Sequence, residues 1–100
     1  MTDKAEIKYV LGVAAEECAE LAQVFSKASR FGPESVGPDQ IKTNRERLVD
    51  EFHDLVGAMD LLFDMGVFEA AHLDMQRELI DAKKIKIKAM MIKTKEKGWW

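Results

Sequence analysis

The side chains with the clearest capacity for chemistry are two pairs of carboxylates. Glu17 and Glu20 stand three residues apart, and so do Glu51 and Asp54. Residues at this spacing share one face of an α-helix, so each pair presents two carboxylates together. Four converging carboxylates repel one another unless a cation lies between them, and their hard oxygen atoms suit Mg²⁺ or Mn²⁺. The pattern indicates a candidate metal site, and the alternative is an ordinary acidic surface, since Glu is a good helix former.

Three long helices are expected to carry these groups. Residues 5–30 contain no proline, and apolar residues recur there at helical spacing: Ile7, Leu11, Ala14, Cys18, Leu21, Phe25 and Ala28. A second helix is predicted to begin at Thr43, which can form a Thr-x-x-Glu capping box with Glu46, and to stop at Gly66. Its apolar stripe would be Leu48, Phe52, Leu55, Met59, Leu62 and Phe63. A third helix is predicted from about Phe68 to about Lys95.

These helices predict an all-α fold, a compact bundle of three or more long helices. The 100 residues suffice for a single domain over residues 1–100. Because a small helical domain buries little surface and the third apolar stripe is sparse, the bundle is expected to be completed by oligomerisation.

The rotation of a helix decides which acidic residues belong to the candidate site. At about 100° per residue, Glu17 and Glu20 lie about 70° and 130° to one side of the first apolar stripe. Glu51 and Asp54 have the same offsets from the second stripe, so antiparallel packing would bring both pairs to the edge of the seam between the helices. Glu16 points to the opposite, solvent side and is excluded from the ligand set. Asp50 is excluded for the same reason.

Cations follow the carboxylates along the same helices. Lys27 comes seven residues after Glu20 and is nearly in register with it, so it could hold a phosphate beside a metal. Arg30 lies almost one turn further on, and Arg47 precedes Glu51 by one turn. Taken singly, each of these cations is typical of a protein surface.

Composition excludes several other classes of protein. The longest uncharged apolar stretches are much shorter than the roughly 20 residues that cross a bilayer, and the N-terminal residues do not resemble a signal peptide. A cytoplasmic protein without a membrane partner is therefore expected. Cys18 is the single cysteine, so it cannot form an internal disulfide and is expected to be a small buried hydrophobe. Seven lysines crowd residues 83–97, but the net charge is −3, and a solvated helix face is favoured over nucleic-acid binding.

The two acidic motifs resemble those of the MazG-like, all-α nucleoside triphosphate pyrophosphohydrolases. The likeness rests on Glu17-x-x-Glu20-Leu21-Ala22, followed after a helix-loop-helix connection by Glu51-x-x-Asp54-Leu55. It covers roughly residues 10–65, and residues 26–32 are similar to the end of the first helix in small, phage-type members. The gap between Glu20 and Glu51 is long for the family, which suggests that residues 32–42 form a lid.

The resemblance implies a function as well as a fold. Glu17, Glu20, Glu51 and Asp54 would bind Mg²⁺, and the enzyme would hydrolyse NTP or dNTP to the monophosphate and pyrophosphate. Lys27, Arg30 and Arg47 would hold the phosphates, together with Lys84 in place of a downstream family lysine, although no Asn follows Asn44. A carboxylate of the cluster would accept the proton of the attacking water. Family members assemble as homodimers or homotetramers.

Two other functions remain open at this point. One is a related hydrolase acting on dUTP or on phosphoribosyl-ATP. The other is a non-catalytic helical interaction module with a basic C-terminal helix. Base preference, sugar preference and the identity of the general base do not follow from the sequence.

Overall fold

The fold is all-α, as predicted. The computed structural model describes residues 3–69 and 76–98, and within these ranges the secondary structure consists of three helices with no strand. They are α1 (Lys4–Phe31), α2 (Asn44–Asp64) and α3 (Gln76–Glu96). The chain divides into two units, Met1–Phe68 and Glu69–Trp100, so α1 and α2 are described together and α3 by itself. The single domain over residues 1–100 stays a prediction.

The two ends of α1 follow from local chemistry. The carboxylate of Asp3 accepts a hydrogen bond from the Ala5 amide at 2.8 Å, which satisfies one of the free N–H groups of the first turn. At the other end Gly32 adopts φ 94°, a conformation that L side chains rarely adopt, and its N–H donates to the Ala28 carbonyl at 2.9 Å. The glycine therefore ends the helix and directs the chain into the loop.

The start of α2 is the predicted capping box. The Thr43 hydroxyl accepts from the Glu46 amide at 3.1 Å, and the Glu46 carboxylate accepts from the Thr43 amide at 2.9 Å. The predicted stop is also confirmed, since α2 ends at Asp64 and Gly66 takes φ 84°. Both ends of α2 are thus set by short-range signals.

Replacement of Thr43 by Ala should destabilise the helical pair. Loss of an N-cap hydroxyl costs about 1 kcal/mol, which lowers the melting temperature of a domain of this size by roughly 4–8 °C. Thermal unfolding followed by circular dichroism measures the change. Thr43→Ser keeps the hydroxyl and is the matched control. Equal melting temperatures for Thr43→Ala and Thr43→Ser would show that the cap does not contribute.

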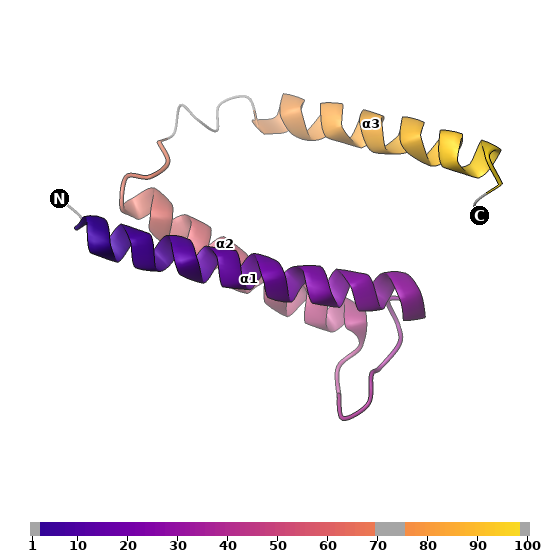
Figure 1. The fold of residues 1–100 in the computed structure, drawn as a ribbon, viewed down its shortest axis with the longest axis horizontal. Helices are drawn as coiled ribbons and strands as arrows, with labels where there is room; N and C mark the ends of the chain where they lie inside the picture. Colours follow the sequence, from indigo (N-terminus) through magenta and orange to yellow (C-terminus); the bar gives the residue numbers. More distant parts are fainter. Residues whose placement is uncertain (1–2, 70–75, 99–100) are drawn as a thin grey trace. The chain divides into compact units, whose positions relative to one another are not determined.

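Helices α1 and α2 pack against each other as an antiparallel hairpin (Figure 1). Buried apolar side chains line the seam, where Leu62 retains only 1% of its exposed surface; the full set is Val10, Leu21, Val24, Ala58 and Leu62. One buried residue is polar: the side-chain amide of Asn44 is 3% exposed and donates to the Gly32 carbonyl at 3.0 Å. This bond ties the start of α2 to the end of α1.

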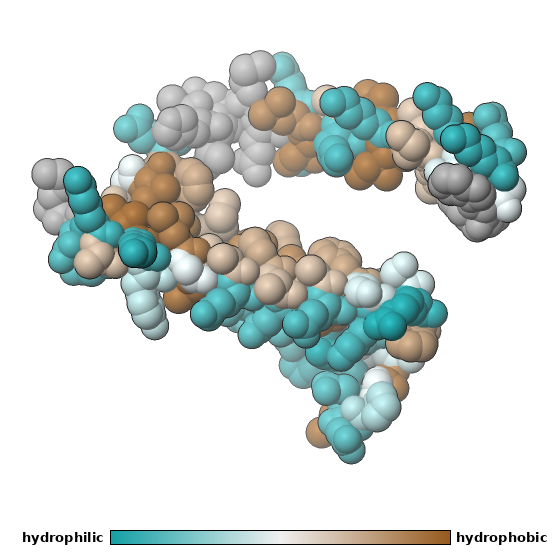
Figure 2. Space-filling model, in the orientation of Figure 1, coloured by the Kyte–Doolittle hydropathy of each residue, from teal (hydrophilic) through white to brown (hydrophobic). Residues whose placement is uncertain are grey.

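The predicted apolar stripe of α1 is wrong in part. Leu11, Cys18 and Phe25 are exposed, whereas Val10 and Val24 occupy the seam. The reason is that α1 carries apolar residues on two faces. The predicted stripe combined residues of both faces, so its centre fell between the buried face and the exposed one. Figure 2 shows apolar surface along one side of the α1–α2 pair and hydrophilic surface along the opposite side.

Helix α2 also has a second apolar stripe. Its members recur at the spacing of one helix face and are 39–56% exposed: Val49, Phe52, Val56, Met59 and Phe63. Phe52, Met59 and Phe63, which were predicted to belong to the core, lie on this exposed stripe. We call these five residues the α2 outer stripe.

The third helix starts later than predicted. Val67, Phe68 and Glu69 are not helical, and α3 is described from Gln76; the predicted helical residues 70–75 lie outside the described residues. Along α3, apolar and basic side chains alternate around the helix, and its large apolar residues are all exposed, among them Leu79, Ile85 and Met90. None of the described helices is long and apolar enough to cross a membrane.

Candidate metal and phosphate site

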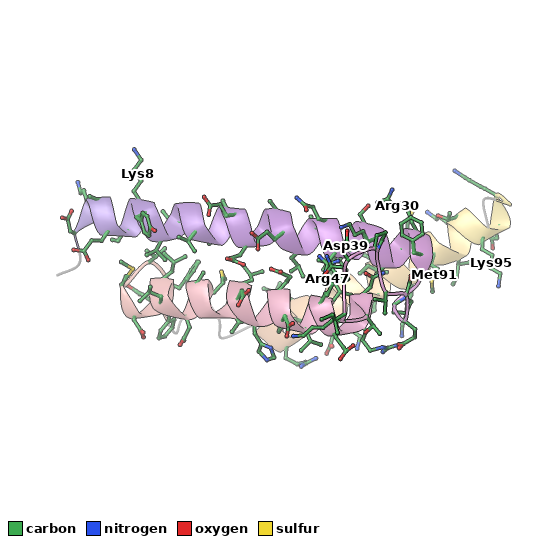
Figure 3. The ribbon with its side chains drawn as sticks, turned by 90° about the horizontal axis from the view of Figure 1, so that it is seen from below. Lys8, Arg30, Asp39, Arg47, Met91 and Lys95 are labelled. Carbon is green, nitrogen blue, oxygen red and sulfur yellow. The ribbon has the colours of Figure 1, made fainter. Side chains whose placement is uncertain are left out.

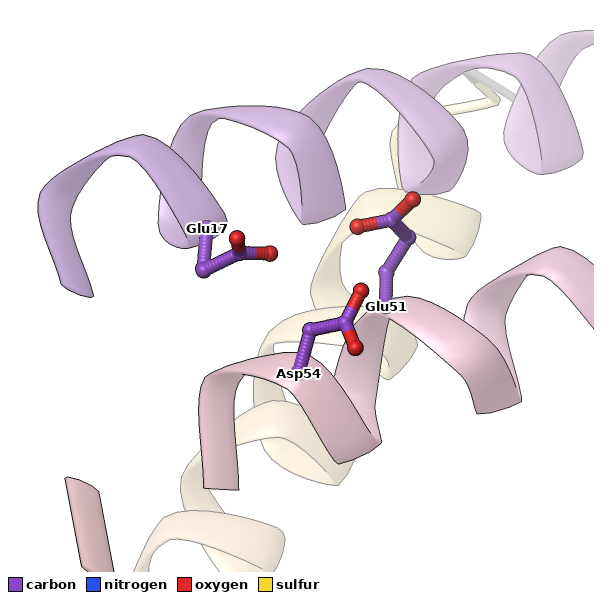
Figure 4. Close-up of side chains that lie close together, drawn as sticks. All are labelled: Glu17, Glu51 and Asp54. Atoms are coloured by element: carbon purple, nitrogen blue, oxygen red, sulfur yellow. The ribbon is translucent and has the colours of Figure 1, made fainter. Parts of the chain in front are cut away.

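Three of the four predicted carboxylates meet in the seam. One oxygen atom each of Glu17, Glu51 and Asp54 lies within 4.8 Å of the other two. Figure 4 shows Glu17 reaching from α1 toward the two residues of α2. The predicted convergence of the acidic motifs is therefore present in the helical pair.

The position of the cluster differs from the expected edge of the seam. Glu17 is seven residues after Val10 and four before Leu21, so it continues the buried stripe of α1. Glu51 is seven residues before Ala58 and continues the buried stripe of α2 in the same way. Both glutamates are half-buried and Asp54 is exposed. The predicted offset was wrong because it was measured from the misplaced apolar stripe.

Burial raises the pKa of both glutamates. For Glu17 the pKa is raised first by loss of hydration and then by the negative charges of Glu20, Asp54 and Glu16. For Glu51 the pKa is raised by loss of hydration, by a hydrogen bond with Glu20, and by the charges of Glu20, Asp54 and Glu17. The seam therefore disfavours the charged form of both groups.

One oxygen of each half-buried glutamate is itself buried and has no hydrogen-bond donor among the described residues. The Oε2 atoms of Glu17 and Glu51 are both buried and have no partner among the described residues. Buried polar atoms are normally paired, and a buried charge without a partner is costly. A cation, a proton or a water molecule between the two helices would satisfy these oxygens.

Glu20, the fourth predicted ligand, lies outside the group of three. It is exposed and contacts the cluster through its hydrogen bond with Glu51. The two excluded acids behave as predicted, because Glu16 and Asp50 are exposed and Asp50 accepts a hydrogen bond from Lys42.

The donor set fits a small divalent cation. Two oxygens on opposite sides of Mg²⁺, each about 2.1 Å away, are about 4.2 Å apart. Among three ligands of one octahedral ion at least two pairs are adjacent and about 3.0 Å apart, so oxygens within 4.8 Å of one another would have to approach more closely when the ion binds. The set is three carboxylates with no nitrogen or sulfur ligand, which favours Mg²⁺ or Mn²⁺ over softer metals.

Two of the four predicted phosphate ligands lie near one another. Lys27 and Arg47 both line an enclosed cavity of about 110 Å³ beneath the α1–α2 loop. Arg47 also lines a more open neighbouring cavity of about 350 Å³, together with Asp39 and Glu51. Figure 3 shows Arg47 and Asp39 at the loop end of the helical pair. A basic group thus stands directly beside the acidic cluster.

Of the other two predicted phosphate ligands, Arg30 is not among the residues that line this cavity, and Lys84 belongs to the other unit of the chain. Arg30 is exposed, and its guanidinium lies 5.2 Å from the centre of the Phe31 ring. Lys84 is on α3, in the other unit of the chain, so its place relative to the cluster stays a prediction.

Sequence reasoning missed the neutral polar side chains that border the enclosed cavity, one at the start of α2 and others in the loop before it. Asn44 is the clearest case: it is a buried polar residue seven positions before Glu51 on the seam face of α2. A polar residue in register with the buried stripe was the available signal. Ser35 and Gln40 also line the cavity, but no periodicity within a loop would have identified them.

No family model, curated protein or solved structure matches the chain. The function is therefore argued from the geometry and charge of the site.

Stability should depend on pH and on divalent cations in a linked way. A carboxyl group with a raised pKa is protonated more in the folded than in the unfolded state, so stability falls as pH rises through the window between the two values. For Glu17 and Glu51 this window opens above the ordinary value of 4.5. We expect the protein in EDTA to melt at a lower temperature at pH 7.5 than at pH 5.5. Mg²⁺ should raise the melting temperature at pH 7.5 and change it little at pH 5.5.

The double variant Glu17→Gln/Glu51→Gln is the control for this prediction. It removes both titrating groups, so its melting temperature should vary less between the two pH values and should not respond to Mg²⁺. A Mg²⁺ response that survives in this variant would contradict the assignment of the cation to the seam.

Proposed function

We propose that the protein is a Mg²⁺-dependent nucleoside triphosphate pyrophosphohydrolase, which converts NTP or dNTP to the monophosphate and pyrophosphate. The observation that carries the proposal is the pair of buried, unpartnered oxygens of Glu17 and Glu51, with Asp54 within 4.8 Å. An uncompensated acidic cluster in a helix seam lowers stability, which is expected where a cation is bound for function.

The residues of the cluster take different roles in this proposal. Glu17, Glu51 and Asp54 hold the cation, which when bound screens the phosphate oxygens and makes a water molecule more acidic. Glu20 lies outside the group of three and is available to accept a proton. Lys27 and Arg47 neutralise phosphate charge on the loop side of the cluster.

The bond changes of the reaction require positive charge beside the leaving pyrophosphate. The oxygen of water forms a bond to the α-phosphorus while the bond from that phosphorus to the bridging oxygen breaks, and pyrophosphate leaves with the electron pair. The proton released by water passes to a carboxylate of the cluster. Positive charge beside the leaving pyrophosphate therefore accelerates the step.

A panel of ribo- and deoxyribonucleoside triphosphates tests the proposal. Purified protein with Mg²⁺ should release pyrophosphate from at least one of them, and excess EDTA should stop the release. The panel includes dUTP, and phosphoribosyl-ATP is assayed beside it, since related hydrolases act on these substrates. Absence of pyrophosphate across the panel, with no Mg²⁺-dependent rise in melting temperature, would contradict the proposal.

A non-catalytic interaction module is the second candidate. It is favoured by α3, where exposed apolar residues are interleaved with lysines, as expected of a helix that binds another protein. Under this alternative the acidic cluster is part of an ordinary surface. The protein would then hydrolyse no triphosphate, and its melting temperature would not respond to Mg²⁺.

A further inference from the structure

The open cavity of about 350 Å³ at the loop end of the helical pair borders the acidic cluster directly. Glu51, a member of the cluster, is one of its lining residues, and Asp50 and Arg47 are two others from α2. The loop before α2 supplies the remaining lining residues, Asp39, Gln40, Ile41 and Lys42. The volume lies within the roughly 300–1,000 Å³ of pockets that take small molecules.

One carboxylate of this cavity has no partner. Asp50 accepts a hydrogen bond from the Lys42 ammonium at 2.5 Å, so these two charges compensate each other. Glu51 shares the acidic cluster, where a cation is proposed. The Asp39 carboxylate makes no hydrogen bond or ion pair with any other described residue. Its capacity to accept hydrogen bonds is therefore open to a ligand.

The backbone around Asp39 is held in a defined turn. Asp39 has φ 59°, a left-handed conformation that Asp and Asn adopt more readily than other side chains. The next amide, that of Gln40, donates to the Gly37 carbonyl at 3.1 Å, and the Asn44 amide donates to the Ser35 carbonyl at 2.9 Å. These bonds fasten the loop to the start of α2, so Asp39 is positioned before a ligand arrives.

The chemistry of these loop residues suits the nucleoside of a nucleotide rather than its phosphates. A carboxylate only accepts hydrogen bonds, and its charge repels phosphate. Carboxylates do accept hydrogen bonds from the 2′-hydroxyl of ribose and from the amino group of cytosine. Next to Asp39 the side chain of Ile41 is 96% exposed, and a base that covers it removes apolar surface from water.

The covalent structure of the substrate gives the cavity its role. The α-phosphate, where the bond breaks, must lie at the cation, and the nucleoside is bonded to that phosphate. The nucleoside therefore needs a space that shares a wall with the cluster, as the open cavity does through Glu51. We propose that this cavity holds the nucleoside and that Asp39 determines specificity, by accepting a hydrogen bond from the 2′-hydroxyl of the sugar or from an amino group of the base. This inference rests on the proposed function.

Binding of the two products to Asp39 variants tests the inference. Isothermal titration of the full chain in Mg²⁺ is carried out with CMP and with inorganic pyrophosphate. Asp39→Gly, which tolerates the left-handed conformation, should weaken CMP binding about tenfold, the loss of one hydrogen bond to a charged group. Its affinity for pyrophosphate should stay the same or rise, since a negative charge is removed. Asp39→Asn should weaken CMP binding less, because the amide oxygen still accepts a hydrogen bond.

Two further ligands identify the group that Asp39 binds. The monophosphate dCMP lacks the 2′-hydroxyl, and UMP carries a carbonyl oxygen in place of the amino group. The wild type should bind CMP about tenfold more tightly than one of these two, and Asp39→Gly should remove that difference. Asp60→Asn removes an exposed aspartate of α2 that lines neither cavity, and it should bind all four ligands like the wild type.

Each other outcome has a defined meaning. Wild-type affinity of Asp39→Gly for CMP overturns the inference, and so does an equal loss of CMP and pyrophosphate affinity at an unchanged melting temperature. A wild type that binds CMP, dCMP and UMP equally, or none of them, also overturns it. Hydrolysis of triphosphates with CMP binding independent of Asp39 overturns the inference and leaves the proposed function intact. Asp39-dependent CMP binding without hydrolysis of any triphosphate overturns the proposed function instead.

Discussion

Replacing Glu51 by Gln should reduce turnover by about a hundredfold or more, the loss that follows removal of a general base or of a carboxylate that holds a catalytic cation. The same change should raise the melting temperature of the protein in EDTA at pH 7.5. The two effects have one cause, because Glu51 places a half-buried negative charge beside three other carboxylates. Gln keeps the shape of the side chain and removes the charge.

The opposite directions of these effects separate a functional role from a structural one. A residue that only supports the fold loses activity and stability together, whereas Glu51→Gln is expected to lose activity and gain stability. Glu16→Gln is the control, since Glu16 is an exposed glutamate next to the cluster residue Glu17. Initial rates of pyrophosphate release and thermal unfolding measure both quantities. Similar rates for Glu51→Gln and Glu16→Gln would contradict the site.

Introducing two lysines into the α2 outer stripe should dissociate the protein in solution. A pair of helices with few buried side chains cannot bury enough apolar surface to be stable alone, and the outer stripe leaves five apolar residues exposed on one face. We expect the wild type to have two or four times the chain mass of 11.4 kDa, and Met59→Lys/Phe63→Lys to have a lower mass. Sedimentation equilibrium measures both masses.

A matched variant separates the effect of apolar surface from that of charge. Asp60→Asn/Asp64→Asn changes the net charge by the same two units on the same part of α2, but leaves the outer stripe intact. It should keep the wild-type mass. A wild-type mass equal to one chain would contradict the expected assembly.

Local signals predicted the ends of the helices well. Thr43 with Glu46 and Gly66 act through hydrogen bonds and backbone conformations within a few residues, so their effects do not depend on distant parts of the chain. The start of the third helix was predicted too early. No capping residue was identified near Phe68, and the apolar residues there were taken as part of the apolar spacing of the helix.

Periodicity alone could not locate the core. Leu11 and Phe25 are as apolar as Val10 and Val24, and the choice between the two faces of α1 is made by the packing of α2. The acidic motifs were still found, because residues three apart share a face wherever the stripe is centred. What the sequence did not show is that Glu17 and Glu51 lie on the buried line itself.

The position of these two glutamates on the buried line also bears on how the helices align. If one helix slid by seven residues, the apolar side chains would still interdigitate, but Glu17 and Glu51 would be separated by about 10 Å along the hairpin. Each would then face aliphatic neighbours, with no single ion able to neutralise both. If a cation binds there as proposed, only the pairing that brings both glutamates together allows one ion to neutralise them, so the two charged groups would favour that alignment of the helices.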